Sequence, residues 1–124
     1  MTIDTHNPQV LLFLLIAGHH ICDFALQNEF VATNKNRHAR NQFTVDERNK
    51  MLSIWPHLLT AHAIMHGTAV FLITQNLTLG ILETVAHWIT DFLKCEGKFN
   101  FHTDQFIHLA FKGLWAYLYL NNIV

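Results

Sequence analysis

Apolar residues gather into four long segments that polar stretches separate. The segments cover about residues 10–28, 56–75, 77–95 and 103–120. Each is too long for an ordinary strand, and no proline interrupts any of them after its first residue, so the pattern predicts helices. Trp55-Pro56 marks the start of the second helix, because proline suits the first helical turn. Thr103-Asp104 is the predicted N-cap pair of the fourth.

A polar stretch, residues 31–55, separates the first two predicted helices. Within it, Thr44 and Glu47 have the spacing of a capping box, which predicts a short extra helix. The chain has 124 residues, a length that fits one domain, and we interpret residues 1–124 as a single four-helix domain.

The polar residues inside these segments form narrow stripes. In the third segment Glu83, His87 and Asp91 are four residues apart and therefore share one face, with apolar residues around the rest of the helix. In a soluble bundle the narrow stripe is apolar and the wide arc is charged. The pattern here is inverted, which predicts an antiparallel four-helix bundle that lies in a membrane with its polar stripes inward.

The positions of lysine and arginine give a second indication of location. Seven of the eight lie in or beside the first and third connections, and the N-terminus, the turn around Asn76 and the C-terminal tail have none. The positive-inside rule then predicts a bacterial inner-membrane protein with loops 31–55 and 95–103 in the cytoplasm. The alternative is a soluble protein whose apolar exterior is buried by oligomerisation.

Composition adds one unusual feature, ten histidines spread along the chain. Charged residues make up only 14% of the sequence, so histidine takes a large share of the polar positions, as expected of a protein that handles metal ions or protons. The net charge of −1 gives no reason to expect a nucleic-acid partner. Cys22 and Cys95 match neither a disulfide framework nor a CxxC motif, and we interpret both as packing residues.

Each predicted helix carries one pair of candidate metal ligands spaced four residues apart, which places both side chains on one face. Because neighbouring helices alternate in direction, the four pairs come to the same depth near the cytoplasmic side. The eight candidate ligands are His19, Asp23, His62, His66, His87, Asp91, Asp104 and His108. His20 is an alternative to His19, which is preferred because it stands four residues before Asp23.

Five imidazoles and three carboxylates suit zinc, manganese or iron better than calcium or magnesium. Eight ligands are too many for one tetrahedral ion, so two divalent ions are predicted. Lys94 and Lys112 are the candidate catalytic residues, placed to hold a substrate anion or to neutralise the carboxylates. Gln27, Asn34 and Lys35 could add contacts at the mouth of the site, and Glu83 and His57 are either partners that orient the ligands or structural polar groups.

The constellation predicts a metal-dependent hydrolase that acts on a phosphoester, in a lipid or a nucleotide, through its two ions. The predicted partners are membrane lipid and a small phosphorylated substrate, and oligomerisation is compatible with the pattern. The main alternative is a non-catalytic metal-binding or metal-transporting membrane protein. A redox di-iron oxygenase is a third reading, although the Glu-x-x-His pairs of the di-iron carboxylate bundles are missing from this sequence.

Four sequence blocks also carry a resemblance. They are HHICDFALQ at 19–27, HAIMHG at 62–67, HWITDFLK at 87–94 and DQFIH at 104–108. In this order they resemble family 3307 of the domains of unknown function, a group of small bacterial and phage proteins, over about residues 10–120. The resemblance implies a membrane protein with these paired ligands and implies no particular activity. The chain departs from the family pattern in its longer polar loop and in the doubled histidine His19-His20.

Overall fold

The structure is a computed structural model and describes residues 3–40 and 43–124. Asparagine side chains cap the start of four of its helices by accepting hydrogen bonds from backbone N–H groups. Asn7 precedes α1 (Pro8–His20), Asn28 precedes α2 (Glu29–Asn34), Asn76 precedes α4 (Leu77–Cys95) and Asn100 precedes α5 (Phe101–Leu120). The predicted cap at Thr103-Asp104 was therefore wrong, because Asn100 Oδ1 accepts the N–H of Thr103 and α5 begins earlier.

The second predicted helix is α3 (Trp55–Thr74), with its proline in the first turn as expected. It ends where Gln75 takes the left-handed conformation, with a φ of 54°. The third predicted helix, α4, has the predicted bounds, and Gly97 with a φ of 72° follows it. These two helices and α5 confirm the prediction of long helices from the apolar segments.

The first segment departs from the prediction of one continuous helix. After α1 the chain continues as a π-helical segment, Ile21–Ala25, before Asn28 starts the short helix α2. The wider π turn places Asp23 and Cys22 in the interior. Since π turns are frequent at functional sites, the irregular end of this helix is itself informative.

The short helix predicted from Thr44 and Glu47 was also wrong. This part of the loop is a hairpin in which β1 (Phe43–Val45) pairs antiparallel with β2 (Met51–Ser53). The Oδ1 of Asp46 accepts hydrogen bonds from the N–H groups of Arg48 and Lys50, and Asn49 adopts a positive φ of 57°. The Asp46 side chain thus stabilises a turn instead of a helix, and the fold is mostly helical with a small exposed hairpin.

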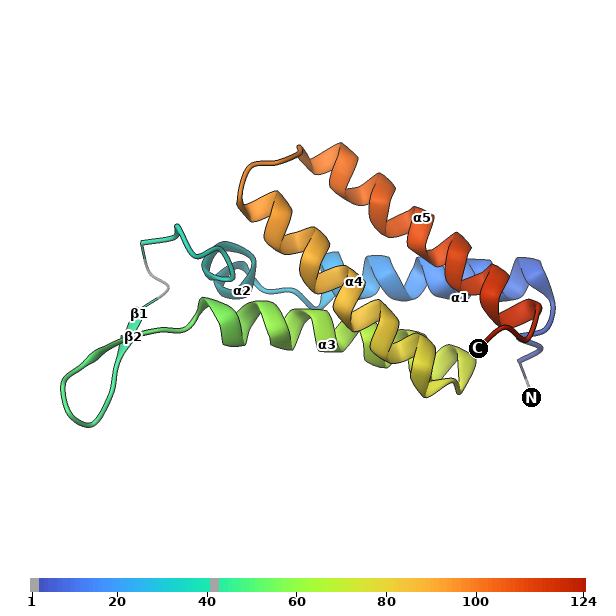
Figure 1. Cartoon of the computed structure of the whole chain (residues 1–124), viewed down its shortest axis with the longest axis horizontal. Coiled ribbons are helices and arrows are strands. Elements are labelled where there is room, and N and C mark those ends of the chain that lie inside the picture. Colours follow the sequence, from blue (N-terminus) through green and yellow to red (C-terminus); the bar gives the residue numbers. More distant parts are fainter. Residues whose placement is uncertain (1–2, 41–42) are drawn as a thin grey trace.

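The four main helices pack together and alternate in direction, so that both termini lie at the same end (Figure 1). Helices α3 and α4 make the most extensive contact. They approach closely because two glycines meet there. A Cβ atom added to Gly67 would lie 2.5 Å from the carbonyl oxygen of Gly80, and one added to Gly80 would lie 3.0 Å from that of Gly67.

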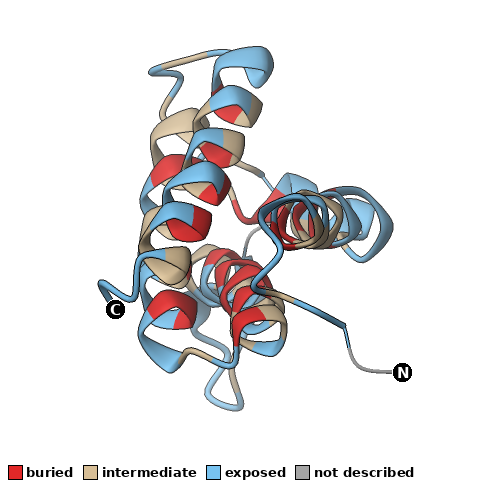
Figure 2. Ribbon diagram, turned by 90° about the vertical axis from the view of Figure 1, so that its right-hand side faces the viewer, coloured by how far each residue is buried: buried red, intermediate tan, exposed pale blue. Residues whose placement is uncertain are grey.

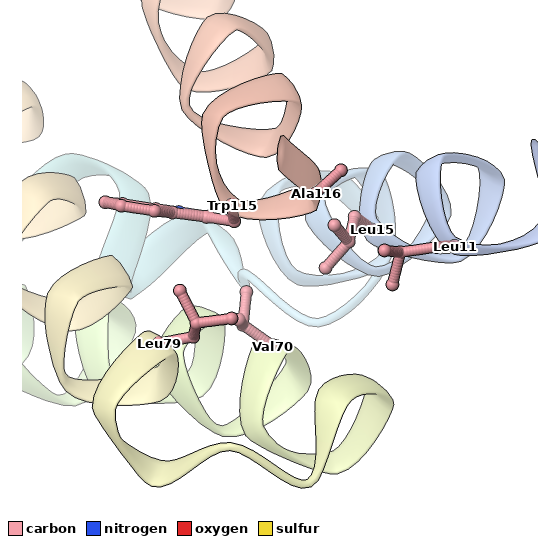
Figure 3. Packing of buried hydrophobic residues seen from close by; sticks show 6 residues of the cluster. All are labelled: Leu11, Leu15, Val70, Leu79, Trp115 and Ala116. Carbon is pink, nitrogen blue, oxygen red and sulfur yellow. The ribbon is translucent and has the colours of Figure 1, made fainter. Parts of the chain in front are cut away.

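Buried faces of the helices point inward around one interior (Figure 2). Of the described residues, fourteen buried ones are polar or charged and nine are apolar, which confirms the inverted pattern. Six of the nine buried apolar residues form a cluster toward the end of the bundle that holds the termini (Figure 3). They are Leu11, Leu15, Val70, Leu79, Trp115 and Ala116. Most of the buried polar side chains lie in the other half, together with Cys22, Leu59 and Ala63.

Two helical segments, Pro8–Ala25 and Trp55–Thr74, are long and apolar enough to cross a membrane. Large apolar side chains are exposed on all four main helices, among them Phe13, Leu72, Val85 and Phe106. Among the described helices, α4 and α5 do not meet the same criterion of length and composition. The structure therefore has the apolar exterior that the sequence pattern predicts. Membrane crossing is indicated for two helices only, and the indication is weak.

Candidate metal centre

All eight predicted ligands are buried and converge in the polar half of the bundle. They come from every main helix: α1 and its π-helical end supply two, and α3, α4 and α5 supply two each. They fall into three overlapping groups whose ligand atoms lie within 4.8 Å of one another. The groups are Asp23, His62, His66 and His87; His19, His87 and His108; and Asp91, Asp104 and His108. Buried His and Asp side chains could thus hold metal ions here.

The first group has the dimensions of a tetrahedral ion site. A zinc–nitrogen bond of about 2.0–2.1 Å places tetrahedral ligand atoms about 3.3 Å from one another. Asp23 Oδ1 lies 3.1 Å from the Nε2 atoms of both His62 and His66 and 3.8 Å from that of His87. The Nε2 atoms of His62 and His87 are 3.3 Å apart. We call this group the first position.

The third group repeats these dimensions and is called the second position. The Nε2 atom of His108 lies 3.3 Å from Asp104 Oδ1 and 3.5 Å from Asp91 Oδ1. Of the described residues, none makes a hydrogen bond to this Nε2 atom or to Asp104 Oδ1, although both atoms are buried. A buried donor or acceptor without a partner is costly, and an ion between these atoms would satisfy both.

The two positions share a carboxylate. Asp91 directs Oδ1 toward His108, while its Oδ2 lies 3.5 Å from His62 Nε2 and 3.8 Å from His87 Nε2. The remaining histidine, His19, joins the set through its Nε2 atom, 3.5 Å from Asp23 Oδ2. The arrangement could therefore hold either one ion or two neighbouring ions.

The candidate ligand histidines turn their Nε2 atoms toward one another in the site. The Nδ1 atoms of His19, His62, His66 and His87 are buried without a hydrogen-bond partner among the described residues. His87 Nδ1 has the nearest candidate, since it lies 3.5 Å from Glu83 Oε1. The Nε2 atoms of His62 and His66 lie within hydrogen-bond distance of Asp23 Oδ1, and those of His62 and His87 face each other at 3.3 Å. A cation between these atoms could bind all of them as ligands.

The two adjacent histidines differ in burial. His19 is 1% exposed and faces the other ligands, whereas His20 is exposed and its Nδ1 atom lies 2.9 Å from the backbone oxygen of Ile16. The preference for His19 from its spacing with Asp23 agrees with this placement.

Three lysines surround the site, each beside a carboxylate. Lys35, which follows α2, donates to Asp91 Oδ2, and Lys94 donates to Asp104 Oδ2 at 3.0 Å. Lys112 lies deeper, where its Nζ donates to Glu83 Oε1 at 2.6 Å. Glu83 Oε2 also accepts the indole N–H of Trp115 at 2.5 Å. Glu83 is thus a buried partner of the site, and Lys112 neutralises it.

The predicted mouth residues have different placements. Gln27 donates to the backbone oxygen of Asp23, and Asn34 donates to the backbone oxygen of Phe30 within its own helix. His57 is exposed at the surface, so it is no orienting partner of the ligands. Of the three predicted mouth residues, Lys35 is the one that donates to a candidate ligand side chain.

The sequence reasoning missed Gln105. Its Nε2 donates to Asp23 Oδ2 at 2.8 Å and to Asp104 Oδ2 at 3.3 Å, and its Oε1 lies 3.1 Å from His19 Nε2. The residue therefore connects candidate ligands of α1 and α5. Its position directly after Asp104 was the available signal, but no spacing rule distinguishes such a glutamine.

The loop that carries Lys35 is attached to the end of α4. Arg37 donates from Nε and Nη2 to the two carboxylate oxygens of Glu96 at 2.6 and 2.7 Å. These hydrogen bonds hold the pKa of Glu96 below its ordinary value. The same guanidinium group lies over the ring of Phe92. This attachment explains why Lys35, far along the chain from α4, reaches Asp91.

Comparison with protein-family models gives one match, a family described as a protein of unknown function, DUF3307, over residues 10–121. The chain belongs to the DUF3307 family. The matched region contains all eight candidate ligands as well as Glu83, Gln105 and the three lysines of the site. No curated protein and no solved structure matches this DUF3307 member. The family assignment confirms the resemblance seen in the four sequence blocks, and the family carries no known function.

Proposed function

We propose that this protein is a membrane-embedded, metal-dependent hydrolase that cleaves phosphoesters with two divalent ions, of zinc, manganese or iron. The observation that carries the proposal is the convergence of eight buried ligand side chains at separations that fit two ion positions. A polar core built for stability alone would pair donors with acceptors. Here imidazole nitrogens face one another, and His108 Nε2 and Asp104 Oδ1 have no hydrogen-bond partner in the described chain.

The proposed location is the inner membrane of a bacterium, with loops 31–55 and 95–103 in the cytoplasm. The two candidate spans are only 28% and 39% buried within the protein, whereas the core helix of a soluble protein is mostly buried. Their exposed apolar surface needs a cover, and a bilayer provides one for all faces of the bundle. The one-sided distribution of lysine and arginine agrees with this orientation.

The charge of the site supports an anionic substrate. The site holds four carboxylates, those of Asp23, Glu83, Asp91 and Asp104, and three lysine ammonium groups, which pair with the last three of these carboxylates. The net charge is therefore −1 when the imidazoles are neutral. Two divalent ions would change that charge to +3. An excess of positive charge in a buried site attracts an anion such as a phosphoester.

The chemistry requires activated water and a stabilised leaving group. Divalent ions held here would polarise the phosphoryl group and lower the pKa of water toward neutrality. Hydrolysis forms one phosphorus–oxygen bond from water and breaks the ester bond, and the departing oxygen takes up a proton. Lys94 is positioned to stabilise charge on the phosphoryl group because its side chain is 30% exposed and reaches from the surface to Asp104.

The proposed role of Lys112 is charge balance. It is 1% exposed and pairs with Glu83, so its contacts support an indirect effect through Glu83 and His87. Direct contact with substrate, the alternative role assigned to it from the sequence, stays a prediction.

The competing proposal, a metal transporter, requires a polar route on both sides of the site. An apolar cluster of residues from α1, α3, α4 and α5 lies between the site and the end that holds the termini (Figure 3), where a transporter would need polar residues. This favours chemistry at the site over passage through it. The experiment must also distinguish the hydrolase from a protein that binds metal without catalysing a reaction.

The test starts with protein purified in detergent without chelator, whose metal content is measured by elemental analysis. We expect about two divalent ions per chain, loss of ions in His19→Gln, and an unchanged content in His20→Gln, the adjacent exposed control. A panel of soluble and lipid phosphoesters then tests turnover. In Asp91→Asn, turnover is expected to fall further than metal content, because a shared carboxylate is lost while the shape of the side chain is kept. Bound metal with no turnover on any phosphoester would favour the binding protein.

A further inference from the structure

Two lysine side chains enter the metal centre from different parts of the chain. Lys35 belongs to the loop after α2 and is 5% exposed, and Lys94 belongs to the last turn of α4. Their ammonium groups meet the carboxylates of the second position, Asp91 and Asp104. Burial of a lysine carries a high desolvation cost, so the enclosed position of Lys35 calls for an explanation beyond surface solubility.

The carboxylates use different oxygens for the second position and for the lysines, although Asp91 Oδ2 also lies 3.5 Å from His62 Nε2 of the first position. Asp91 and Asp104 turn Oδ1 toward His108 and use Oδ2 for Lys35 and Lys94, respectively. An ion at the second position therefore does not have to displace either lysine. Without an ion, the two carboxylates and two ammonium groups cancel. With a divalent ion, this part of the site carries a charge of +2.

Each ammonium group also has donors to spare. A lysine ammonium group has three N–H donors. Within the described part of the chain, Lys35 and Lys94 each make one hydrogen bond from Nζ, and Lys94 lies in addition over the ring of Phe101. Up to two donors on each lysine therefore have no acceptor among the described residues.

We infer that Lys35 and Lys94 form a binding site for the terminal phosphate of a phosphomonoester. The inference rests on the proposed function and narrows its substrate class. A monoester phosphate carries nearly two negative charges at neutral pH and three acceptor oxygens. A diester offers a single charge and two free oxygens. A site with an excess charge of +2, which includes two ammonium donors, matches the monoester better in both charge and number of acceptors.

The experiment measures binding, independently of turnover. Isothermal titration calorimetry in detergent compares inorganic phosphate with dimethyl phosphate, which has the charge of a diester. It uses protein loaded with Mn²⁺ and the same protein after chelation. The variants are Lys35→Met and Lys94→Met, and Lys98→Met is the control, because Lys98 is exposed in the turn between α4 and α5.

Loaded wild-type protein is expected to bind inorganic phosphate at least about tenfold more tightly than dimethyl phosphate. Lys35→Met and Lys94→Met should each weaken phosphate binding by about tenfold, with little change for dimethyl phosphate. Lys98→Met should match the wild type, and chelated protein should lose phosphate binding. Displacement of phosphate by a nucleoside monophosphate identifies a soluble substrate, and displacement by phosphatidate in mixed micelles identifies a lipid. Either result supports the site.

Three results would overturn the inference while leaving the hydrolase intact. They are unchanged phosphate affinity in both lysine variants that retain their Mn²⁺, equal affinity for the two probes, and no displacement by either monoester. Chain that binds no Mn²⁺ at all contradicts the proposed function and the inference together. The Mn²⁺ content of each variant, measured on the same sample, separates these cases and detects a variant that fails to fold.

Discussion

The contact between Gly67 and Gly80 controls how closely α3 and α4 approach, and it can be tested with one methyl group. In Gly67→Ala the new Cβ would lie 1.9 Å from Thr84 Oγ1 and 2.5 Å from the carbonyl oxygen of Gly80. The Thr84 side chain could turn aside only by giving up its 2.9 Å hydrogen bond to that carbonyl oxygen. The backbone oxygen itself cannot rotate away, so α4 has to move.

The size of this movement follows from the distances. Bringing the oxygen from 2.5 Å to a contact of 3.0–3.4 Å requires α4 to retreat by roughly 0.5–0.9 Å. Gly67 is next to His66, and His87 lies two turns after Gly80 on α4. Metal sites tolerate ligand displacements of about 0.2 Å, so the first position should lose its geometry. Overpacking of this kind costs about 1–3 kcal/mol of folding free energy.

The measurement is thermal unfolding in detergent together with elemental analysis. Gly67→Ala should lower the Tm by about 5–10 °C and reduce the ion content. Gly113→Ala is the matched control, because a Cβ at Gly113 meets nothing within 4 Å and alanine is the better helix former by about 1 kcal/mol. Its Tm should stay level or rise. A Gly67→Ala protein with the Tm and ion content of the wild type would refute the claim that this glycine contact sets the ligand geometry.

Three further predictions concern single contacts. Asp23→Asn should remove the ion of the first position, seen as a loss of one equivalent by elemental analysis, and an unchanged content would contradict that position. Glu83→Gln should lower the free energy of unfolding by about 3–5 kcal/mol, because it leaves Lys112 buried without its counter-charge. The double variant with Lys112→Met should lose less stability than the single variant. Unfolding in denaturant measures both values, and a larger loss in the double variant would contradict the prediction. Because Arg37 holds the pKa of Glu96 below its ordinary value of 4.5, this pair stabilises the loop above that pH and stops doing so as the pH falls through the lowered pKa. The protection of the loop amides, with the observed exchange rates corrected for the intrinsic rate at each pH, should therefore fall between about pH 5 and pH 3 in the wild type and stay level in Glu96→Gln.

The candidate site was predictable because it depends on periodicity. A spacing of four residues fixes two side chains on one helical face, whatever the rest of the fold does. That rule favoured His19, which is buried, over the exposed His20, and it placed Glu83 in line with His87 and Asp91. It held even where the chain becomes π-helical, since Asp23 still lies 3.5 Å from His19 Nε2 through its Oδ2 atom. The alternating direction of the helices then brought the pairs to one depth.

The features that the sequence did not reveal depend on contacts between distant segments. The approach of Lys35 to Asp91 follows from the attachment of its loop to α4 through Arg37 and Glu96, which no local pattern announces. In the hairpin, the capping-box spacing competed with a turn formed by Asp46, and the turn prevailed. Local sequence rules predict the conformations that a segment favours, but contacts with distant segments decide which of these conformations forms.

The inverted interior predicts that folding depends on metal binding more than in a bundle with an apolar core. The apolar cluster lies at one end, and the other half has mainly ligand side chains in its interior beside Leu59, Ala63 and Cys22. Ions bound there would supply the attraction that apolar packing supplies elsewhere, since binding to the folded state alone adds to its stability. Removal of metal should therefore loosen the polar half, where His62, His66 and His87 meet, before the apolar end. Hydrogen exchange after chelation should rise first in the halves of α3 and α4 that carry these residues, with the halves that carry Val70 and Leu79 protected longer. Equal exchange along both helices would mean that the ions serve chemistry alone and that the fold stands without them.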